Sequence, residues 1–361
     1  MKARKHGHVS ARSGFTILDL AATVAVGTLM CAAALPLAAK AGSQNTRAVS
    51  RMHLNTLHVV HTMFAADHND RQFSAIPDNF GLRPSCALYQ AQFGCIDPLV
   101  LGEDSLGQSW GFYLGCAGNG TNGACGNISC YKPIDFAEPT EGAYRYANTP
   151  RINEYVSGRF YDPVFFAPDD PTLTDQTRKF IRAGADFELN DPDGASYIWG
   201  RTSYDMSPAA MFDPVVMGDG QQGNNPQWRN PSSTSTAGGY GYRSPAVSQC
   251  AYPSLKTRLM EHAMTSHAPA PCNKGHPGCF PYMWNQSIES QNIALFYDGS
   301  VQTLSARDAM NSDAHSATPL WLRNTPLGVN GVDGAAAADA QVRTSAHFLT
   351  TYGIRGRDRL D

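Results

Sequence analysis

The first 39 residues constrain this chain more than any other part of it. A leader carries four basic side chains and no acidic one, at Lys2, Arg4, Lys5 and Arg12. From Leu20 to Ala39 no side chain is charged. A helical run of about 20 apolar residues is long enough to cross the roughly 30 Å hydrocarbon core of a membrane. The sequence therefore predicts one membrane span, with the leader in the cytoplasm and the rest of the chain exported.

One carboxylate stands at the start of the apolar run. An ionised side chain such as Asp19 is costly in hydrocarbon unless it has a partner. The residues Gly14-Phe15-Thr16, followed by Asp19 and later by Pro36, make this segment similar to the N-terminus of a type IV pilin-like protein. Proteins of this class are prepilins or pseudopilins, which assemble into helical filaments.

The resemblance implies roles for these residues. Prepilin peptidase would cut between Gly14 and Phe15 and methylate the new amino group of Phe15. Asp19 is the fifth residue counted from Phe15, a position at which the family nearly always has Glu, and Asp shortens the reach by one methylene. Its carboxylate would compensate the Phe15 amine of a neighbouring subunit. Pro36 would kink the helix.

Three other interpretations of this segment remain open. A conventional signal peptide could be cut at Ala39-Lys40-Ala41, although the apolar run exceeds the usual 7–15 residues and contains Asp19. A lipoprotein signal at Cys31 is disfavoured because Met30 is large for the preceding position. A plain uncleaved anchor also fits the length.

Two further stretches resemble a subfamily of large bacterial prepilin-type proteins. The first is MHLNTLHVVHTMFAADHNDRQF, in which Leu54, Leu57, His61 and Phe64 recur at helical spacing. We expect this helix to end near Asp67, with Val60 and Met63 widening its buried stripe. The second is a predicted hairpin around Asp298-Gly299. In the subfamily a His usually precedes the Asp-Gly with nine residues between them, and here that position is Ile288.

Composition indicates an exported, folded, loop-rich domain. The 361 residues carry a net charge of −3, which argues against a nucleic-acid-binding surface. Gly and Pro are frequent, at 33 and 23 residues. Eight cysteines follow the apolar run, and an oxidising compartment favours disulfides between them. These disulfide candidates are Cys86, Cys95, Cys116, Cys125, Cys130, Cys250, Cys272 and Cys279.

Local patterns predict several further elements. Strands are expected at 110–114, 143–146, 161–167, 197–201 and 215–218, and a short helix or strand at 180–189. A flexible surface loop is expected at 226–242. Residues 255–264 have helical spacing, and residues 292–310 read as strand, turn, strand and helix.

The sequence shows no familiar catalytic motif. It has no GxSxG, HExxH, P-loop or GxGxxG pattern. Asp191 and Asp193 are weak calcium candidates, because a complete calcium loop would need a further oxygen ligand and a distal Glu. Packed or solvated histidines are favoured over a metal site for His53, His58, His61 and His68. We therefore expect no cofactor.

The sequence as a whole predicts an α+β protein in four parts. These are a basic prepilin leader at 1–14, a long kinked transmembrane and assembly helix at 15–39, its continuation at 40–73, and an exported pilin-like head at 74–361 with an antiparallel sheet and long disulfide-bonded loops. The expected function is that of a structural, minor subunit of a type IV pilus or type II secretion-like filament, not an enzyme. Its partners would be prepilin peptidase, the membrane and other pilin-like subunits, with no nucleic acid. It would be a single-pass protein of the cytoplasmic membrane. An anchored binding module that never polymerises and an anchored secreted hydrolase are the alternatives.

Overall fold

The structure is a computed structural model of the chain. It describes residues 45–83, 85–94, 96, 102–103, 109–110, 131–136, 142–156, 162–168, 170, 202–222, 225–261, 291–326, 328–329 and 345–361. The chain divides into two compact units, Met1–Thr46 and Arg47–Asp361. Apart from the first two residues of one helix, every element below belongs to the second unit, which we call the head.

Helices in the described part of the chain are mostly short. A helix spans residues 45–67, and we call it the 45–67 helix. The other α-helices are α2 (Cys86–Phe93), α3 (Pro150–Asn153) and α6 (Ala306–His315). The 3-10 helices are η1 (Phe80–Leu82), η3 (Ala143–Arg145), η4 (Pro163–Phe165), η5 (Pro208–Met211), η6 (Pro214–Val216), η7 (Ala237–Gly239), η8 (Val247–Gln249) and η9 (Gly353–Arg355).

An antiparallel sheet forms the centre of the head. Its four strands lie in the order β3-β6-β7-β8, with β3 (Tyr204–Met206), β6 (Thr257–Glu261), β7 (Gln291–Phe296) and β8 (Val301–Ser305). Three two-stranded ribbons add β1 (Gly102–Glu103) with β2 (Ser109–Trp110), β4 (Met217–Gln222) with β5 (Asn225–Trp228), and β9 (Asn324–Thr325) with β10 (Gly328–Val329).

The hairpin between β7 and β8 turns at Asp298-Gly299. Leu295 pairs with Val301 and Gln291 with Ser305 in its register. Gly299 has a φ of 85°, a left-handed conformation that suits a residue without a Cβ. The Asp298 carboxylate accepts a hydrogen bond from the Ser300 backbone N–H at 2.9 Å, which fixes the turn.

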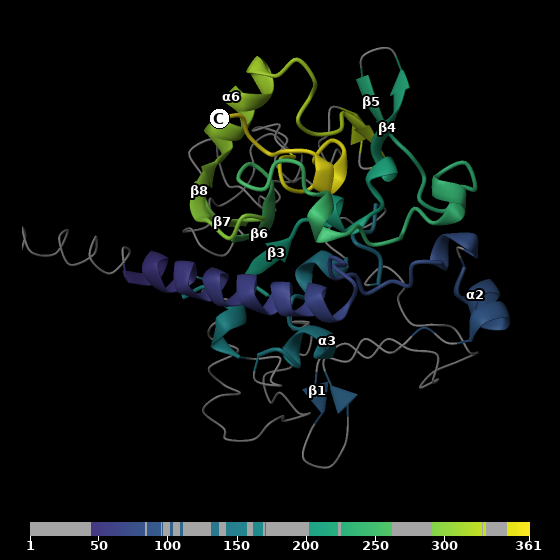
Figure 1. The fold of residues 1–361 in the computed structure, drawn as a ribbon, viewed down its shortest axis with the longest axis horizontal. Helices are drawn as coiled ribbons and strands as arrows, with labels where there is room; N and C mark the ends of the chain where they lie inside the picture. Colours follow the sequence, from purple (N-terminus) through teal and green to yellow (C-terminus); the bar gives the residue numbers. More distant parts are fainter. Residues whose placement is uncertain are drawn as a thin grey trace, which may run out of the picture. The chain divides into compact units, whose positions relative to one another are not determined.

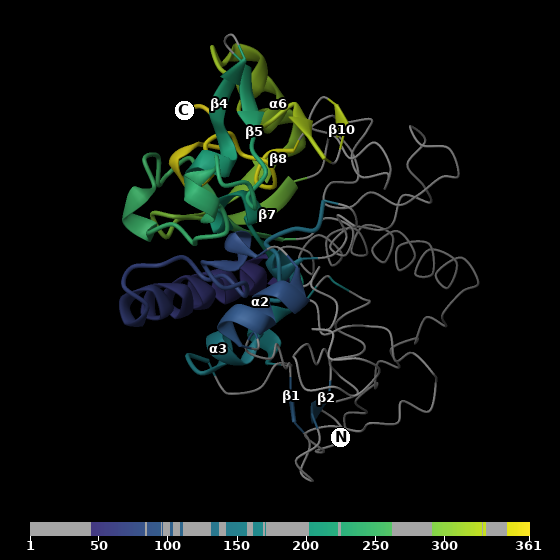
Figure 2. The ribbon, with the colours of Figure 1, turned by 90° about the vertical axis from the view of Figure 1, so that its right-hand side faces the viewer.

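The 45–67 helix lies across this sheet, and α3 lies on the side of the helix that faces away from the sheet (Figure 1). Figure 1 shows the helix running below β3, β6 and β7, with α3 on its opposite side, and Figure 2 shows the same layers from a perpendicular direction. The helix ends at residue 67, as the sequence predicts. Asn69 and Asp70 then adopt left-handed φ values of 55° and 63°, which these residue types tolerate.

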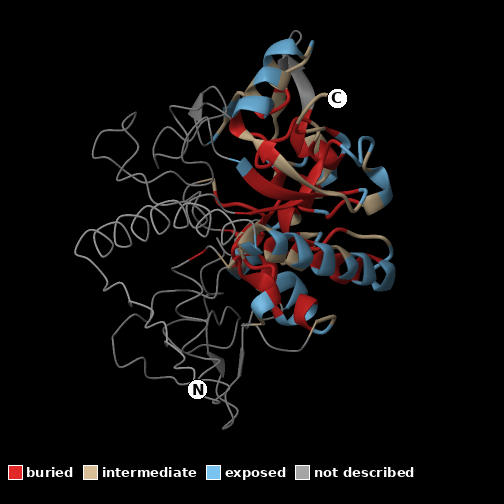
Figure 3. Ribbon diagram, turned by 90° about the vertical axis from the view of Figure 1, so that its left-hand side faces the viewer, coloured by how far each residue is buried: buried red, intermediate tan, exposed pale blue. Residues whose placement is uncertain are grey.

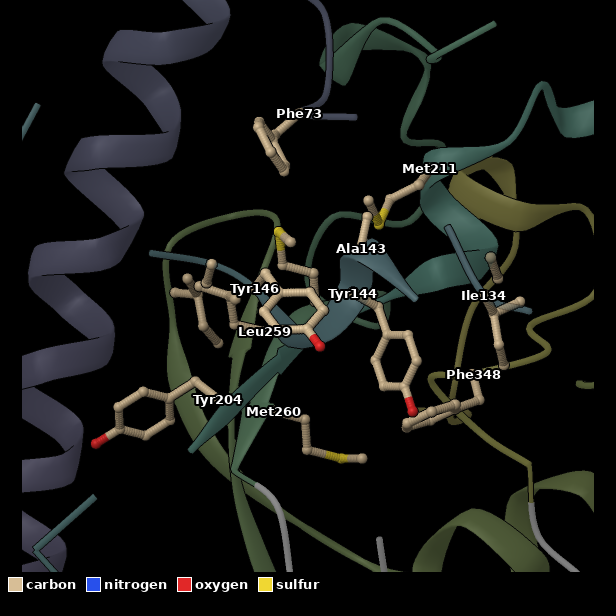
Figure 4. Close-up of a cluster of buried hydrophobic side chains, with 14 of the residues drawn as sticks. Phe73, Ile134, Ala143, Tyr144, Tyr146, Tyr204, Met211, Leu259, Met260 and Phe348 are labelled. Atoms are coloured by element: carbon tan, nitrogen blue, oxygen red, sulfur yellow. The ribbon is translucent and has the colours of Figure 1, made fainter. Parts of the chain in front are cut away.

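The hydrophobic core lies between the helix, the sheet and the C-terminal segment 345–361. In Figure 3 the buried residues concentrate where these parts meet. Figure 4 shows Tyr204 pointing toward the 45–67 helix, while Tyr144 and Phe348 pack against each other deeper in the cluster. The Tyr144 and Phe348 ring centroids are 5.1 Å apart in an edge-to-face arrangement.

The expected fold class is wrong in its main element. We expected a long, kinked helix that spans a membrane and runs on into the head, but no helix among the described residues is long and apolar enough for that. The 45–67 helix has one side buried in the core, and its first two turns carry the charged residues Arg47 and Arg51. The predicted segment 15–39 lies outside the described residues. The antiparallel sheet is also small, since much of the described core comes from 3-10 helices and irregular chain.

Several local predictions also need correction. Residues 143–146 and 161–167 contain the 3-10 helices η3 and η4 instead of strands. Residues 255–264 contain strand β6 instead of a helix. Residues 226–242, expected to be a flexible loop, include part of β5 and the buried side chains of Thr236 and Tyr242.

Candidate assembly surface

The solvent-facing side of the 45–67 helix is unusually apolar. Met52, Val59 and Met63 are 65%, 55% and 48% exposed. Their spacing of seven and four residues places them on one side of the helix, because an α-helix has 3.6 residues per turn. No residue between Arg51 and Asp67 on this helix is Asp, Glu, Lys or Arg. We call the exposed residues 52, 55, 56, 59, 62, 63 and 66 the outward face.

The threonines of the outward face do not make it more polar. The Thr56 hydroxyl donates to the Met52 carbonyl at 3.1 Å, and the Thr62 hydroxyl donates to the His58 carbonyl at 2.7 Å. Both hydrogen bonds stay within the helix, which is a common arrangement for a mid-helix threonine. Apart from the exposed amide of Asn55, the face therefore offers methyl and thioether groups to a partner, in a strip about four turns long.

The opposite side of the helix is held firmly by the head. Leu54 and Leu57 have no exposed surface, and Val60 and Phe64 have almost none. Fully burying one such side chain contributes about 1.5–3 kcal/mol. At the outer end of the helix, the guanidinium of Arg47 donates to the Gln291 carbonyl and the Thr303 hydroxyl, both at 3.3 Å. The helix is therefore a fixed part of the head.

The Asp298-Gly299 turn packs directly against this helix. A Cβ built on Gly299 would lie 2.8 Å from Nε2 of His58. Real Cβ contacts are not this short, so a residue larger than glycine would have to displace the His58 imidazole. The hairpin and the helix therefore meet closely at this one contact.

Histidines on the buried side of the helix are kept neutral by their surroundings. Burial lowers the pKa of His61 well below its usual value, and the charge of Arg258 lowers it further. Burial also lowers the pKa values of His58 and His53. His53 Nδ1 lies 3.1 Å from the Phe166 carbonyl oxygen, a hydrogen bond within the packing. These are packed histidines, and no group of metal ligands occurs among the described residues.

A second polar cluster is enclosed within the head. Lys256 Nζ lies 2.9 Å from both Asp358 Oδ2 and Ser207 Oγ, and Thr257 Oγ1 lies 2.8 Å from His347 Nδ1. All five side chains are buried. A Ser–Lys contact can support hydrolysis when substrate reaches it. Here the hydroxyl and the amine are sealed from solvent, so the cluster ties β6 to the segment 345–361.

The structure places few of the residues singled out from the sequence. Asp298 and Gly299 form the β7–β8 turn. Cys250 is a free, half-buried thiol, so the disulfide expected of it is not formed. Burial raises the pKa of this thiol to about 11. The candidates whose side chains lie outside the described residues are Gly14, Phe15, Asp19, Pro36, Cys86, Cys95, Cys116, Cys125, Cys130, Asp191, Asp193, Cys272 and Cys279.

The outward face was missed by the sequence reasoning. Met63 was assigned to the buried stripe, whereas it is 48% exposed. The signal that could have found the face is the absence of charge. A solvated side of a soluble helix usually carries charged residues, and this one carries none between Arg51 and Asp67.

Comparisons with known proteins give no further guidance. No protein-family model matches the chain, and neither a curated protein nor a solved structure is similar to it.

Proposed function

We propose that this chain is a structural subunit of a pilus-like or secretion-type filament, in which copies or related subunits pack through the outward face of the 45–67 helix. The partner is another helix of the same kind. A minor subunit suits the length of the chain, because the head is large for a repeated filament component. The function proposed is assembly, without catalysis.

The observation that carries this proposal is the outward face itself. Three large apolar side chains are exposed in one strip, with internally satisfied threonines between them and no formal charge. Helices that pack against each other present such strips at three- and four-residue spacing. An isolated surface helix would lose solubility from this arrangement and gain nothing.

The N-terminal sequence supports the same proposal independently. The leader, the Gly14-Phe15 junction and Asp19 resemble a prepilin. Prepilin peptidase would release Phe15, and the amine of Phe15 would pair with Asp19 of a neighbouring subunit. The segment that makes this contact leads directly into the helix that bears the outward face. Both sets of proposed contacts lie in the first 66 residues of the sequence.

A charge placed on the outward face tests the proposal. Val59→Arg should leave the head folded, because Val59 is 55% exposed and its side chain can extend into water. Assembly should fail, because the guanidinium would be buried without a partner between helices. Incorporation into sheared filaments or cross-linked oligomers is the measurement, with circular dichroism as the check on folding.

A matched control lies on α2. Leu88 is 56% exposed on a helix that also lacks charge. Leu88→Arg introduces the same charge at the same exposure but away from the 45–67 helix, and it should assemble normally. Normal assembly of Val59→Arg would rule out the outward face as the contact, and an equal failure of both variants would point to a general effect of added charge.

A further inference from the structure

The buried side of the 45–67 helix holds imidazole nitrogens that have no hydrogen-bond partner in the described structure. His61 has no exposed surface, and neither of its ring nitrogens has a hydrogen-bond partner in the described structure. Nδ1 of His58, one turn earlier, is also buried and without a partner. Buried polar atoms are normally hydrogen-bonded, so such atoms in a native structure call for an explanation.

A permanent cation lies beside them. Arg258 extends from β6 toward the helix, and its guanidinium donates to the His61 carbonyl at 3.1 Å. Its Cζ stands 5.3 Å from the ring centre of Tyr297 on β7. The side chain is buried, and its Nε has no partner within the described residues. Arginine keeps its charge at any physiological pH.

The acidic groups around this cluster are few. The charge of Asp298, in the β7–β8 turn, raises the pKa of His58. The charge of Asp70, after the end of the helix, raises the pKa of Arg258. Asp162 acts on His53 at the other end of the buried side. The remaining titratable groups near Arg258 are Tyr297 and Cys250, which are neutral at ordinary pH. No carboxylate is hydrogen-bonded to the His61 ring to receive its charge.

We propose that mild acid undocks the 45–67 helix from the sheet before the rest of the head unfolds, because protonation of His61 and His58 creates like charges beside Arg258. In the docked state, a protonated His61 would be a second buried cation with no hydrogen-bond acceptor. In the undocked state, the same imidazole is solvated and takes up a proton near pH 6.5. This device does not depend on filament assembly.

The sign of the effect follows from proton linkage. A histidine whose pKa is lowered by docking stabilises the docked state fully above pH 6.5, and that stabilisation is lost as the pH falls toward its docked pKa. Each such histidine changes the docking equilibrium by up to tenfold per pH unit. An undocked imidazole is already half protonated at pH 6.5, so the shift between pH 6.5 and pH 4.5 is up to about 50-fold for each histidine and up to about 2,500-fold for His61 and His58 together.

Hydrogen exchange measured by mass spectrometry tests the proposal on the full-length protein. Protection factors, corrected for the intrinsic pH dependence of exchange, are compared between peptides from residues 45–67 and from the β4–β5 ribbon at pH 6.5, 5.5 and 4.5. We expect the helix to lose protection first and steeply. Equal ratios between the two regions at all three pH values would overturn the proposal.

A non-titrating variant gives the second arm of the test. His61→Leu fills an apolar site with a side chain of similar size and should flatten the loss of protection by up to about 100-fold at pH 4.5. His61→Gln serves the same purpose with a polar side chain if the leucine variant folds poorly. His315→Leu, at an exposed position on α6, is the control and should behave like the wild type. A loss as steep in both His61 variants as in the wild type would refute the role of His61.

Discussion

Lys256 Nζ lies 2.9 Å from Asp358 Oδ2, and neither side chain has any exposed surface. Asp358 also accepts hydrogen bonds from the backbone N–H groups of Thr257 at 2.9 Å and His347 at 2.8 Å. The Thr350 hydroxyl donates to Asp358 Oδ1 at 2.5 Å. A carboxylate with this many donors is compensated for the loss of water, and removing its charge leaves Lys256 as an unpaired buried cation.

The first prediction concerns this pair. Asp358→Asn should lower the free energy of unfolding by about 3–5 kcal/mol, the usual cost of breaking a buried ion pair from one side. Urea denaturation followed by circular dichroism is the measurement.

Asp78→Asn is the matched control for this substitution. Asp78 faces Arg243 at 3.8 Å, and both side chains are almost half exposed. An exposed pair of this kind contributes less than about 1 kcal/mol. Equal effects of the two substitutions would mean that the Lys256–Asp358 pair does not hold the segment 345–361 in place.

The second prediction is a pH dependence at the same cluster. Burial lowers the pKa of His347 to about 3, with Lys256 adding to the effect. In the unfolded state His347 therefore binds a proton near pH 6.5, whereas in the folded state it stays neutral until the pH approaches 3. The stabilisation is complete above pH 6.5 and is lost as the pH falls toward 3. His347→Asn should flatten stability over this range, and asparagine tolerates the left-handed φ of 73° at this position.

Asp358 titrates in a separate and lower range. Burial by itself raises its pKa, but Lys256, His347 and two hydroxyl donors together lower it to about 2. Its contribution is present above the unfolded pKa near 3.9 and is lost as the pH falls through 2. Unfolding free energies measured from pH 2 to pH 7 for the wild type and for His347→Asn would separate the pH range of His347 from that of Asp358. An unchanged slope between pH 3 and pH 6.5 in His347→Asn would disprove the assignment.

The third prediction tests the contact between the hairpin and the helix. Gly299→Ala imposes a left-handed conformation on alanine and pushes a Cβ to 2.8 Å from His58 Nε2. Gly238→Ala, at a φ of 66° and a ψ of 22° with no atom within 4 Å of the new Cβ, imposes the left-handed backbone strain alone. We expect about 1–2 kcal/mol of destabilisation for Gly238→Ala and more for Gly299→Ala.

A double variant separates the two causes. Gly299→Ala combined with His58→Ala removes the imidazole that the new Cβ would meet. The additional cost of Gly299→Ala, measured in the His58→Ala background, should then fall to that of Gly238→Ala. The idea of a shape match fails if that cost is the same in both backgrounds.

The fourth prediction concerns the cysteines. The Cys250 thiol is half-buried with a pKa raised to about 11, so almost none of it is thiolate at pH 8. Iodoacetamide should label Cys250 much more slowly in the native protein than in urea. The other seven cysteines after the apolar run are an odd number, so at most three disulfides form among them. Non-reducing peptide mapping that pairs Cys250 would contradict the prediction.

The fifth prediction returns to the N-terminus. Native protein should begin at methylated Phe15, and mass spectrometry that finds a start at Gly42 would instead indicate an ordinary signal peptide. Asp19→Ala should reach the envelope normally but fail to assemble, because the Phe15 amine of the neighbour would lose its counter-charge. Asp19→Glu should be tolerated. Normal assembly of Asp19→Ala would argue against a filament.

Elements whose signals are local were predictable from the sequence. The Asp298-Gly299 hairpin and the helix after it depend on turn chemistry and a cap, because the Ser305 hydroxyl accepts from the Asp308 N–H at 3.0 Å. The helix ending at residue 67 depends on the Asn69-Asp70 pair in the same way.

Strand β6 could not be predicted, because its determinants are distant. All five of its residues are buried, so no alternation marks a face. Its polar members Thr257, Arg258 and Glu261 bond to Asp358, His61 and Ser50, which are 101, 197 and 211 residues away. Within residues 255–264 alone, the only pattern in the sequence is the helical spacing of the apolar residues.

The 3-10 helices η4 and η6 carried a signal that was not used. Each begins with the same three residues, Asp162-Pro163-Val164 and Asp213-Pro214-Val215. In both, the Asp carboxylate accepts from the backbone N–H of the valine, at 2.9 and 3.0 Å. The repeated Asp-Pro-Val predicts a capped turn in preference to a strand.

The ion pair between Lys256 and Asp358 also sets the order in which the head can form during synthesis. The 45–67 helix leaves the ribosome early, but its cover includes β6, and the buried carboxylate that binds Lys256 and Thr257 at the start of β6 is made only when Asp358 is reached. The N-terminal part of the head must therefore wait about 300 residues for its last support, a separation that makes folding slow. At roughly 5–20 residues per second, this keeps the growing chain unfolded for tens of seconds. For the filament subunit proposed above, such late folding would keep the chain able to cross a membrane before it assembles.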